Sequence, residues 1–586
     1  MISKSLQLRA LVLSAGAVAT FLSYPYLDWD ALALASLVPL MWAIETTDRG
    51  RAAFSQGLFF GWIVNLGGFY WITGLLRDFA YLPMVVAVPL YALLALQQGL
   101  VFGLGAWFAW WLRARLGWSL IGAWVPAFLA AETLVPMIFP WFLGNSQANH
   151  TLFVQSADLG GPWLVSALVV VFNAALATVL LQRSAGIAGL ARRTSLRVAL
   201  VVLALNYAYG AAAYHRESAR EEGAERIRVG MVQANIGIYS KGEADTLEYN
   251  LRLHQRMSAA LESEGAALIV WPETAYQVRA YAQVLGEGPR DLDEARRWAR
   301  ASGILHLEAT WLPRSDLPLE AAVDDETGLL DRVAAQRGFS LPLLTGVLRS
   351  RVLSEEEAQR YPSFGPGPRR LLPYNSALLL DAEGRVLGDV DKIQLMPFGE
   401  SVPLARTLYR WTGVSVLRFL PAVSDFEPGR EVRVLELPRE GRPLAARLGM
   451  MICYEDILPR FGRRLQPLGP NLLVNLTNDA WFGDTAEPWL HQTLATFRSI
   501  EQRTWLLRSV NTGVTGAIDS LGRVRAHTQT WEEATLLVDV PLLEAQRTPY
   551  MRWGNVFGWG GVLVMLLAWV LGGRGERSRE AGSGSG

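Results

Sequence analysis

The sequence contains a single cysteine, Cys453, in 586 residues. One cysteine cannot form an intrachain disulfide, and it cannot supply a cysteine cluster for a metal ion. Histidine is also scarce, and no two of the six histidines have the i, i+4 spacing with which a helix presents a pair of metal ligands. We therefore expect no metal and no cofactor.

Charge of either sign is scarce as well. Charged residues make up 18% of the chain, against about 25% in an ordinary soluble protein. Lysine plus arginine equals aspartate plus glutamate at 54 each, so the formal net charge is zero. A nucleic-acid binder usually carries a basic surface, so this class of partner is not expected. The hydrophobic share of 51%, with 22 tryptophans, instead favours a membrane protein.

The apolar residues are grouped in long segments separated by short charged loops. Most of these segments approach the ~20 residues needed to cross ~30 Å of hydrocarbon. We predict seven transmembrane helices within residues 1–213, an extramembrane domain at 214–555, an eighth helix at 556–573 and a tail at 574–586. The eight segments cover roughly residues 10–26, 30–46, 53–76, 81–112, 117–139, 160–182, 196–213 and 556–573.

Basic residues mark one side of the predicted membrane. Alternate loops contain lysine or arginine, whereas the loops between them, such as LRDFAYLP, contain almost none. By the positive-inside rule, both termini are cytoplasmic and the 214–555 domain lies outside. The first segment resembles a cleavable signal peptide, but removing it would break the charge alternation, so we expect an uncleaved anchor.

The extramembrane domain contains short runs of β-branched and leucine residues that end in turn or polar residues. Helical patterns lie between several of them, for example TLEYNLRLHQRMSAALES (246–263) and PWLHQTLATFRSIEQR (488–503). Strands that alternate with helices predict an α/β domain whose sheet faces are covered. Segment 280–335 is charged and poorly patterned, and we interpret it as an excursion that contains some helix.

Three reactive side chains follow predicted strands: Glu273, Lys392 and Cys453. Taken singly, such an acid or lysine is usually a solvated surface charge, and such a cysteine a small buried hydrophobe. Working groups in open α/β sheets, however, gather at the carboxyl ends of strands. A carboxylate that removes the thiol proton and an ammonium that stabilises an oxyanion would together permit acyl transfer through a thioester. The backbone N–H of Tyr454 is a further candidate oxyanion donor.

Four motifs around these residues resemble the signature blocks of the nitrilase, or carbon–nitrogen hydrolase, superfamily: VWPET, DKIQLMPFGESVP, MICYED and NLTNDAWFG. The resemblance implies an α-β-β-α sandwich with Glu273 as general base, Lys392 as oxyanion stabiliser and Cys453 as nucleophile. It also implies supporting residues, for which a purely structural role remains an open alternative. These residues are Glu400, Tyr454, Glu455 and Asn375.

With its apolar segments, the whole chain resembles the membrane-embedded N-acyltransferases of this superfamily, which complete bacterial lipoprotein maturation. The implied fold is an eight-helix transmembrane bundle that carries an extracytoplasmic nitrilase-like sandwich, in the inner membrane with the sandwich in the periplasm. The implied donor is a phospholipid, phosphatidylethanolamine at its sn-1 ester, and the acceptor is the diacylglyceryl-cysteine of apolipoproteins. We expect a monomer. An amidase that uses water as acceptor, and an inactive scaffold that binds lipoproteins, are the rival interpretations.

Two features depart from that pattern or stand outside it. Relatives carry a lysine–tryptophan pair near the lipid entrance, whereas this chain has Lys241 without the tryptophan. Glu132 lies inside the fifth apolar segment, where a carboxylate costs about 2.5–3.5 kcal/mol unless it faces the bundle or the interface. It is either a paired structural acid or a group that holds a lipid head group.

Overall fold

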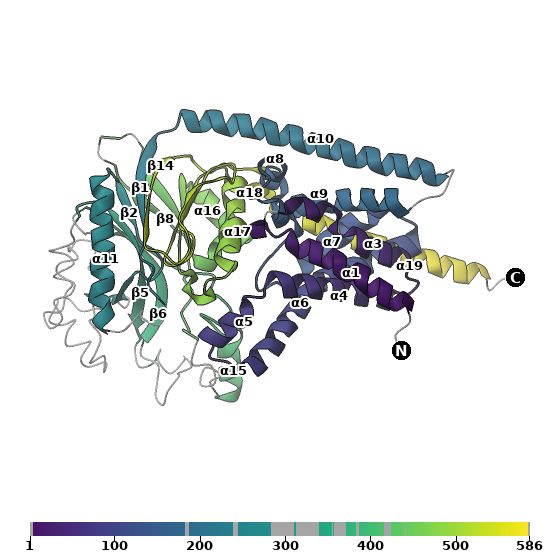
Figure 1. Cartoon of the computed structure of the whole chain (residues 1–586), viewed down its shortest axis with the longest axis horizontal. Coiled ribbons are helices and arrows are strands. Elements are labelled where there is room, and N and C mark those ends of the chain that lie inside the picture. The colour runs from purple at the N-terminus through teal and green to yellow at the C-terminus, as the bar shows by residue number, and fades with distance from the viewer. Residues whose placement is uncertain are drawn as a thin grey trace.

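The computed structural model describes most of the chain as two bodies, a bundle of apolar helices and an α/β body (Figure 1). Apart from residues 280–282 and 310–311, segment 280–335 lies outside the described residues, and so does Lys241. The interpretation of that segment therefore stays a prediction. The described residues are 4–27, 29–181, 187–237, 244–282, 310–311, 339–353, 356, 371–382, 386–414, 423–439, 441–442 and 444–583.

Each predicted apolar segment contains helix, but the lengths differ from the prediction. By length and composition, the described residues hold three helices that could span a membrane, within Met84–Leu116, Ala157–Leu181 and Arg193–Glu222. A fourth span results if Gly50–Gly68 and Ile72–Phe79, which are bent by 70° relative to each other, are counted as one. The count of eight spans and their orientation therefore remain predictions. The main helices of this body are α1 (Lys4–Leu22), α4 (Gly50–Gly68), α6 (Met84–Leu116), α7 (Leu120–Leu134), α9 (Ala157–Leu181), α10 (Ile187–Glu222) and α19 (Val556–Ser583).

The second predicted segment is broken into short pieces: the 3-10 turn η2 (Asp30–Leu32), α2 (Ala33–Ser36) and α3 (Val38–Glu45). Pro39 lies in the first turn of α3, and a proline both lacks a backbone donor and disfavours the α-conformation of the residue before it. A hydropathy pattern does not register such a break. At the other end of the bundle, α10 continues past residue 213 to Glu222, and the first strand begins at Arg226.

Close backbone contact joins α4 to α6 through small residues. A Cβ added to Gly57 would lie 2.4 Å from the carbonyl oxygen of Phe102, and one added to Gly61 would lie 2.6 Å from that of Gly99. Neither distance leaves room for a side chain, so these positions need glycine. Small-residue contacts of this kind are typical of helices that pack within a membrane.

The α/β body consists of two mixed sheets packed face to face, which confirms the predicted α/β class. The order of one sheet is β14-β1-β2-β5-β3-β4, with β6 and β7 beyond β5, and the order of the other is β13-β12-β11-β10-β9-β8. The strands are β1 (Arg226–Gln233), β2 (Leu268–Val270), β3 (Tyr276–Ala282), β4 (Thr310–Trp311), β5 (Leu343–Val352), β6 (Leu371–Leu380), β7 (Val386–Asp391), β8 (Val434–Leu437), β9 (Ala446–Ile452), β10 (Leu472–Thr477), β11 (Leu506–Val510), β12 (Gly516–Ile518), β13 (Val524–His527) and β14 (Ala534–Pro541).

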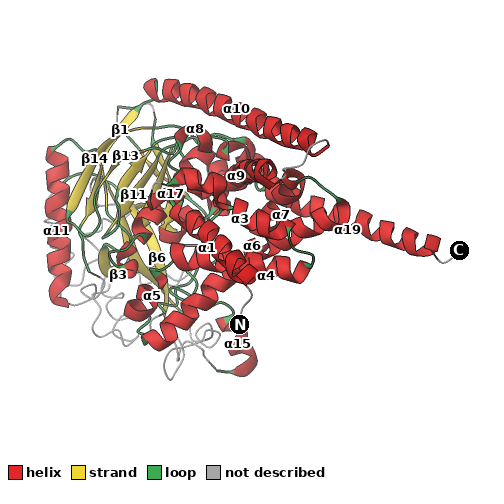
Figure 2. Cartoon of the chain, turned by 45° about the vertical axis from the view of Figure 1, so that its right-hand side comes forward, coloured by secondary structure: helices red, strands yellow, loops and turns green. Residues whose placement is uncertain are grey.

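A core of aliphatic side chains from both sheets, among them Val229, Leu344, Met450 and Val474, fills the space between them. Helix α11 (Ala244–Ser263) covers the outer face of the first sheet. Helices α16 (Pro459–Leu465) and α17 (Glu487–Gln502) cover the second. The layers are therefore helix, sheet, sheet and helix, and α17 also faces the helical body (Figures 1 and 2).

A buried ion-pair network fastens α17 to the helical body. Arg503, which follows α17, donates to the carboxylate of Asp158 at 2.7 and 3.0 Å and to the backbone oxygen of Gln155 at 2.9 Å. From α10, Arg220 donates to the backbone oxygen of Arg503 at 2.5 Å. Arg503 and Asp158 are almost fully buried. Breaking a buried ion pair leaves a buried charge without its partner, which is strongly unfavourable. This network therefore fixes how the sheets pack against the helices.

Candidate active site

Glu273, Lys392 and Cys453 each lie just beyond the end of a strand. Glu273 follows β2, Lys392 directly follows β7, and Cys453 directly follows β9. The first two come from one sheet and the cysteine from the other, so the interface between the sheets brings them together. Glu273 and Lys392 are buried, with 4% and 1% of their surface exposed, whereas Cys453 is partly exposed.

Lys392 sits between two carboxylates. Its Nζ lies 3.4 Å from Oε1 of Glu273 and 2.8 Å from the carboxylate of Glu400. The Nδ2 amide of Asn375 donates to Glu273 at 2.6 Å and to Glu400 at 3.1 Å, and the backbone N–H of Met396 donates to Glu400 at 2.8 Å. Charge-assisted hydrogen bonds are the stronger ones in a buried site, so Glu273 is held in a fixed orientation.

The backbone of Cys453 is left-handed, with a φ of 50°. This conformation is uncommon for a residue with a side chain, and it is typical of sharp turns at functional sites. The side-chain amide of Asn475 donates to the Cys453 carbonyl at 3.0 Å and so supports the turn. Tyr454 is the second residue of the 3-10 helix η7 (Cys453–Ile457) and lies in its first turn, where backbone N–H groups have no partner within the helix.

The electrostatics favour a neutral thiol beside a charged lysine. Burial, together with the negative charge of Glu273, raises the pKa of the Cys453 thiol well above its usual value, although Lys392 opposes this shift. Burial would lower the pKa of Lys392, but Cys453, Glu400 and Glu273 outweigh it and raise that pKa well above the usual value. The thiol thus needs a base to remove its proton, and the lysine stays available as a cation.

Glu455 links the turn at Cys453 to the segment after Lys392. Its Oε1 accepts hydrogen bonds from the backbone N–H groups of Ile393 at 2.7 Å and Gln394 at 3.0 Å. Its Oε2 accepts from the backbone N–H of Ile452 at 2.8 Å. Burial raises the pKa of Glu455 to about 7, against the effect of these three bonds. The carboxylate therefore sets the position of Lys392 relative to Cys453.

Replacing Glu455 with glutamine should disturb this link, because an amide NH₂ cannot accept a hydrogen bond. Leaving a buried N–H unpaired costs about 1–3 kcal/mol, and we expect the variant to lose stability and acylation rate accordingly. The native carboxyl has a raised pKa, so its contribution to stability is complete below the unfolded pKa and is lost as pH rises through about 7. Melting temperatures measured across this range should therefore fall more in the parent than in Glu455→Gln.

Glu436→Gln, at an exposed position on β8, is the matched control for that experiment. It should leave both the acylation rate and the pH dependence of the melting temperature unchanged. Identical curves for the parent and Glu455→Gln would contradict the positioning role of Glu455.

The site borders the helical body. The Tyr454 hydroxyl donates to the backbone oxygen of Ile138, in the segment that follows α7. Glu132, in α7 itself, is buried and accepts from the N–H of Leu143 at 2.8 Å and the Ser166 hydroxyl at 3.0 Å. Glu132 therefore faces the interior of the bundle and organises the segment under Tyr454. This contact pattern matches the structural alternative for Glu132 more closely than the head-group alternative.

Aromatic side chains form the junction between the two bodies near the nucleophile. After β10, the 3-10 turn η9 (Asp479–Phe482) places Trp481 with its ring centre 3.9 Å from that of Phe79, and Phe482 with its ring centre 5.1 Å from that of Trp71. Phe79 and Trp71 belong to the bent segment that follows α4. An apolar junction of this kind, beside a reactive thiol, suits a lipid chain.

Sequence reasoning missed a second buried cluster behind the nucleophile turn. It contains Asp456, Asp479, Glu487, His491 and Arg508, which come from four separate segments. The available signal was the spacing of Glu487 and His491, which puts both on one face of a helix.

Two sheets packed face to face, with a glutamate, a lysine and a cysteine brought together at their strand ends, define a carbon–nitrogen hydrolase. The family model described as carbon-nitrogen hydrolase matches residues 228–550. A second model, described as apolipoprotein N-acyltransferase N-terminal domain, matches residues 16–175. The chain belongs to the apolipoprotein N-acyltransferase family.

Several relatives cover nearly the whole chain. The apolipoprotein N-acyltransferase of Geobacter metallireducens is 31% identical over 93% of this chain and 92% of its own length. That of Azotobacter vinelandii is 30% identical over 96% and 94%. Among solved structures, an amidase from Nesterenkonia sp. is 18% identical over 56% of this chain and 94% of its own, with a TM-score of 0.32. The alignments with these relatives include both the helical body and the α/β body, whereas a soluble amidase would need only the α/β body.

Proposed function

We propose that this protein moves a fatty acyl chain from a membrane phospholipid to an apolipoprotein through a thioester on Cys453. The donor is phosphatidylethanolamine, cleaved at the sn-1 ester, and the acceptor is the α-amine of an N-terminal diacylglyceryl-cysteine. The observation that carries the proposal is the convergence of Glu273, Lys392 and Cys453 at the junction with the apolar helices. The names and the length of the relatives favour this transfer over a hydrolytic amidase.

In the first half-reaction, Glu273 takes the thiol proton and the sulfur attacks the ester carbonyl. Lys392 and the backbone N–H of Tyr454 stabilise the oxyanion that forms. The C–O bond then breaks, and the proton on Glu273 passes to the departing lyso-phospholipid oxygen. A thioester remains on Cys453.

In the second half-reaction, the acceptor amine attacks the thioester carbonyl and gives up a proton to Glu273. The C–S bond breaks, the new amide leaves with its peptide, and the sulfur recovers the proton. Water competes for the same thioester. The aromatic junction around Trp481 and Phe482 favours the amine, because it holds lipid chains and excludes solvent.

The remaining assignments follow from the contacts. Glu400 and Asn375 hold Lys392 and Glu273 in place, Glu455 sets the distance between Lys392 and the nucleophile turn, and Tyr454 ties that turn to the bundle. Both substrates are anchored by chains whose extraction costs about 0.8 kcal/mol per CH₂, so a multi-pass protein of the bacterial inner membrane brings the site to them. The basic loops, by the positive-inside rule, support a periplasmic position for the α/β body.

Incubation with phosphatidylethanolamine labelled in its sn-1 chain, and with a lipopeptide that begins with diacylglyceryl-cysteine, tests the proposal. We expect label on the protein first, then on the lipopeptide as an amide. Release of labelled free fatty acid without any N-acyl peptide would instead identify an amidase-type hydrolase. Binding of the lipopeptide without labelled protein would identify a scaffold.

A further inference from the structure

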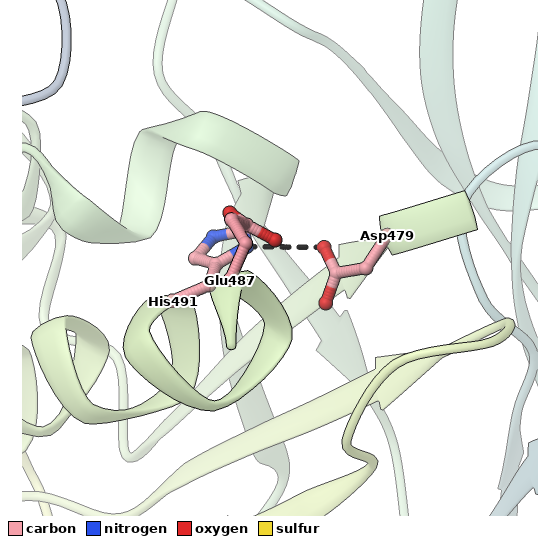
Figure 3. Close-up of side chains that lie close together, drawn as sticks. All are labelled: Asp479, Glu487 and His491. Atoms are coloured by element: carbon pink, nitrogen blue, oxygen red, sulfur yellow. Dashed lines mark hydrogen bonds and ion pairs between the residues drawn. The ribbon is translucent and has the colours of Figure 1, made fainter. Parts of the chain in front are cut away.

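The cluster behind the nucleophile turn is buried and rich in acids. The Nε2 atom of His491 lies 2.9 Å from Asp456, and its Nδ1 atom lies 3.1 Å from Asp479 and 3.8 Å from Glu487. On its other oxygen, Asp456 accepts from Nε of Arg508 at 2.9 Å. Figure 3 shows Asp479 reaching toward His491 from one side while Glu487 lies over the ring. None of these residues exposes more than 6% of its surface.

Hydrogen bonds within the cluster leave carboxylate oxygens unsatisfied. Oδ2 of Asp479 and Oε2 of Glu487 are buried and accept no hydrogen bond from the described part of the chain. Buried polar atoms are almost always paired, so these two acid oxygens keep acceptor capacity that a bound cation could use.

The charge count gives the same answer. With a neutral imidazole, three carboxylates and one guanidinium leave the cluster with two negative charges in a buried site. One divalent cation would restore neutrality.

We propose that Asp479, Glu487 and His491 form a binding site for a divalent transition-metal ion. Their ligand atoms all lie within 4.8 Å of one another. Ligands about 2.1 Å from a tetrahedral zinc ion are about 3.4 Å apart, and the separations of 3.1 and 3.8 Å from Nδ1 bracket that value. Asp456 on Nε2 supplies the carboxylate partner that metal-bound histidines usually have.

Metal binding forms coordinate bonds only, and no oxidation or group transfer is involved. The ion would join the turn Asp479–Phe482 to the first two turns of α17, beside the nucleophile turn that carries Asp456. The proposal is independent of the acyl-transfer reaction. It departs from the expectation of no metal, which rests on the single cysteine and the spacing of the histidines and takes no account of a glutamate–histidine pair.

Zn²⁺ binding to untagged, chelator-treated full-length protein tests the site. The Cys453→Ala background removes the thiol as a competing ligand. We expect calorimetry to show one ion bound per chain, and we expect the melting temperature to rise with Zn²⁺ concentration.

Glu487→Gln tests the carboxylate ligand. Glutamine has nearly the size of glutamate but is a weaker ligand for a divalent metal ion, so the Zn²⁺ affinity should fall by at least about 100-fold. His527→Gln, at an exposed histidine on β13, is the control and should bind like the parent. Failure of the parent to bind Zn²⁺ in large excess would overturn the proposal, and so would equal binding by Glu487→Gln.

Discussion

Cys453→Ala should abolish both the acyl-enzyme and the N-acylated product. The sulfur is the nucleophile in the proposed reaction, and no second thiol exists to replace it. Loss of a covalent nucleophile typically removes several orders of magnitude, so we expect the transfer rate to fall by at least about 10⁴-fold. Intact mass after mixing with phospholipid should show one added acyl group on the parent and none on the variant.

Because Cys453 is the single cysteine, every thiol signal in this experiment comes from that residue. Before donor is added, the parent should have one titratable thiol per chain, and after acylation it should have none. Addition of lipopeptide should restore the thiol as the acyl group leaves. Cys453→Ser is the second variant, because a hydroxyl without an activated pKa is a much weaker nucleophile. A thioester mass that persists in either variant would refute the assignment.

Part of this site can be predicted from the sequence because local residue patterns indicate it. The run ARLGMMIC contains β9 and ends at Cys453, and the run RVLGDVDK contains β7 and ends at Lys392, so the sequence alone predicts both residues at strand ends. Asn375 was assigned to a family block, but its place on β6, where it reaches both Glu273 and Glu400, depends on the pairing of β6 with β5 and β7. Strand pairing is non-local, and residue patterns do not encode it directly.

Less of the detailed geometry of the helical body could be predicted from the sequence. Hydropathy located every apolar segment, but it could not show that the 53–76 segment turns by 70° after Gly68 or that the 30–46 segment is broken. Both events depend on single residues and close contacts. A Cβ on Gly68, for example, would lie 2.2 Å from the ring of Tyr24. An average over ~20 residues does not resolve such details.

Lys392→Met should cost both transition-state stabilisation and the arrangement of the base. Removing one oxyanion donor typically lowers kcat by about 10²–10³-fold. In addition, Glu273 and Glu400 would then share a buried site without their cation, and two uncompensated carboxylates raise each other's pKa. Because the base must be ionised to take the thiol proton, the residual rate should peak at higher pH than that of the parent. The pH–rate profile for acylation of Cys453 measures both effects.

The double variant Lys392→Met, Glu400→Gln separates catalysis from stability. It removes one positive and one negative charge together, so the melting temperature that Lys392→Met lowers should largely recover. Acylation should not recover, because the oxyanion still lacks its ammonium. The shift of the pH optimum should shrink, since Glu273 then faces a neutral amide. Recovery of the acylation rate together with stability would show that Lys392 serves only to neutralise the two carboxylates, and its catalytic assignment would be wrong.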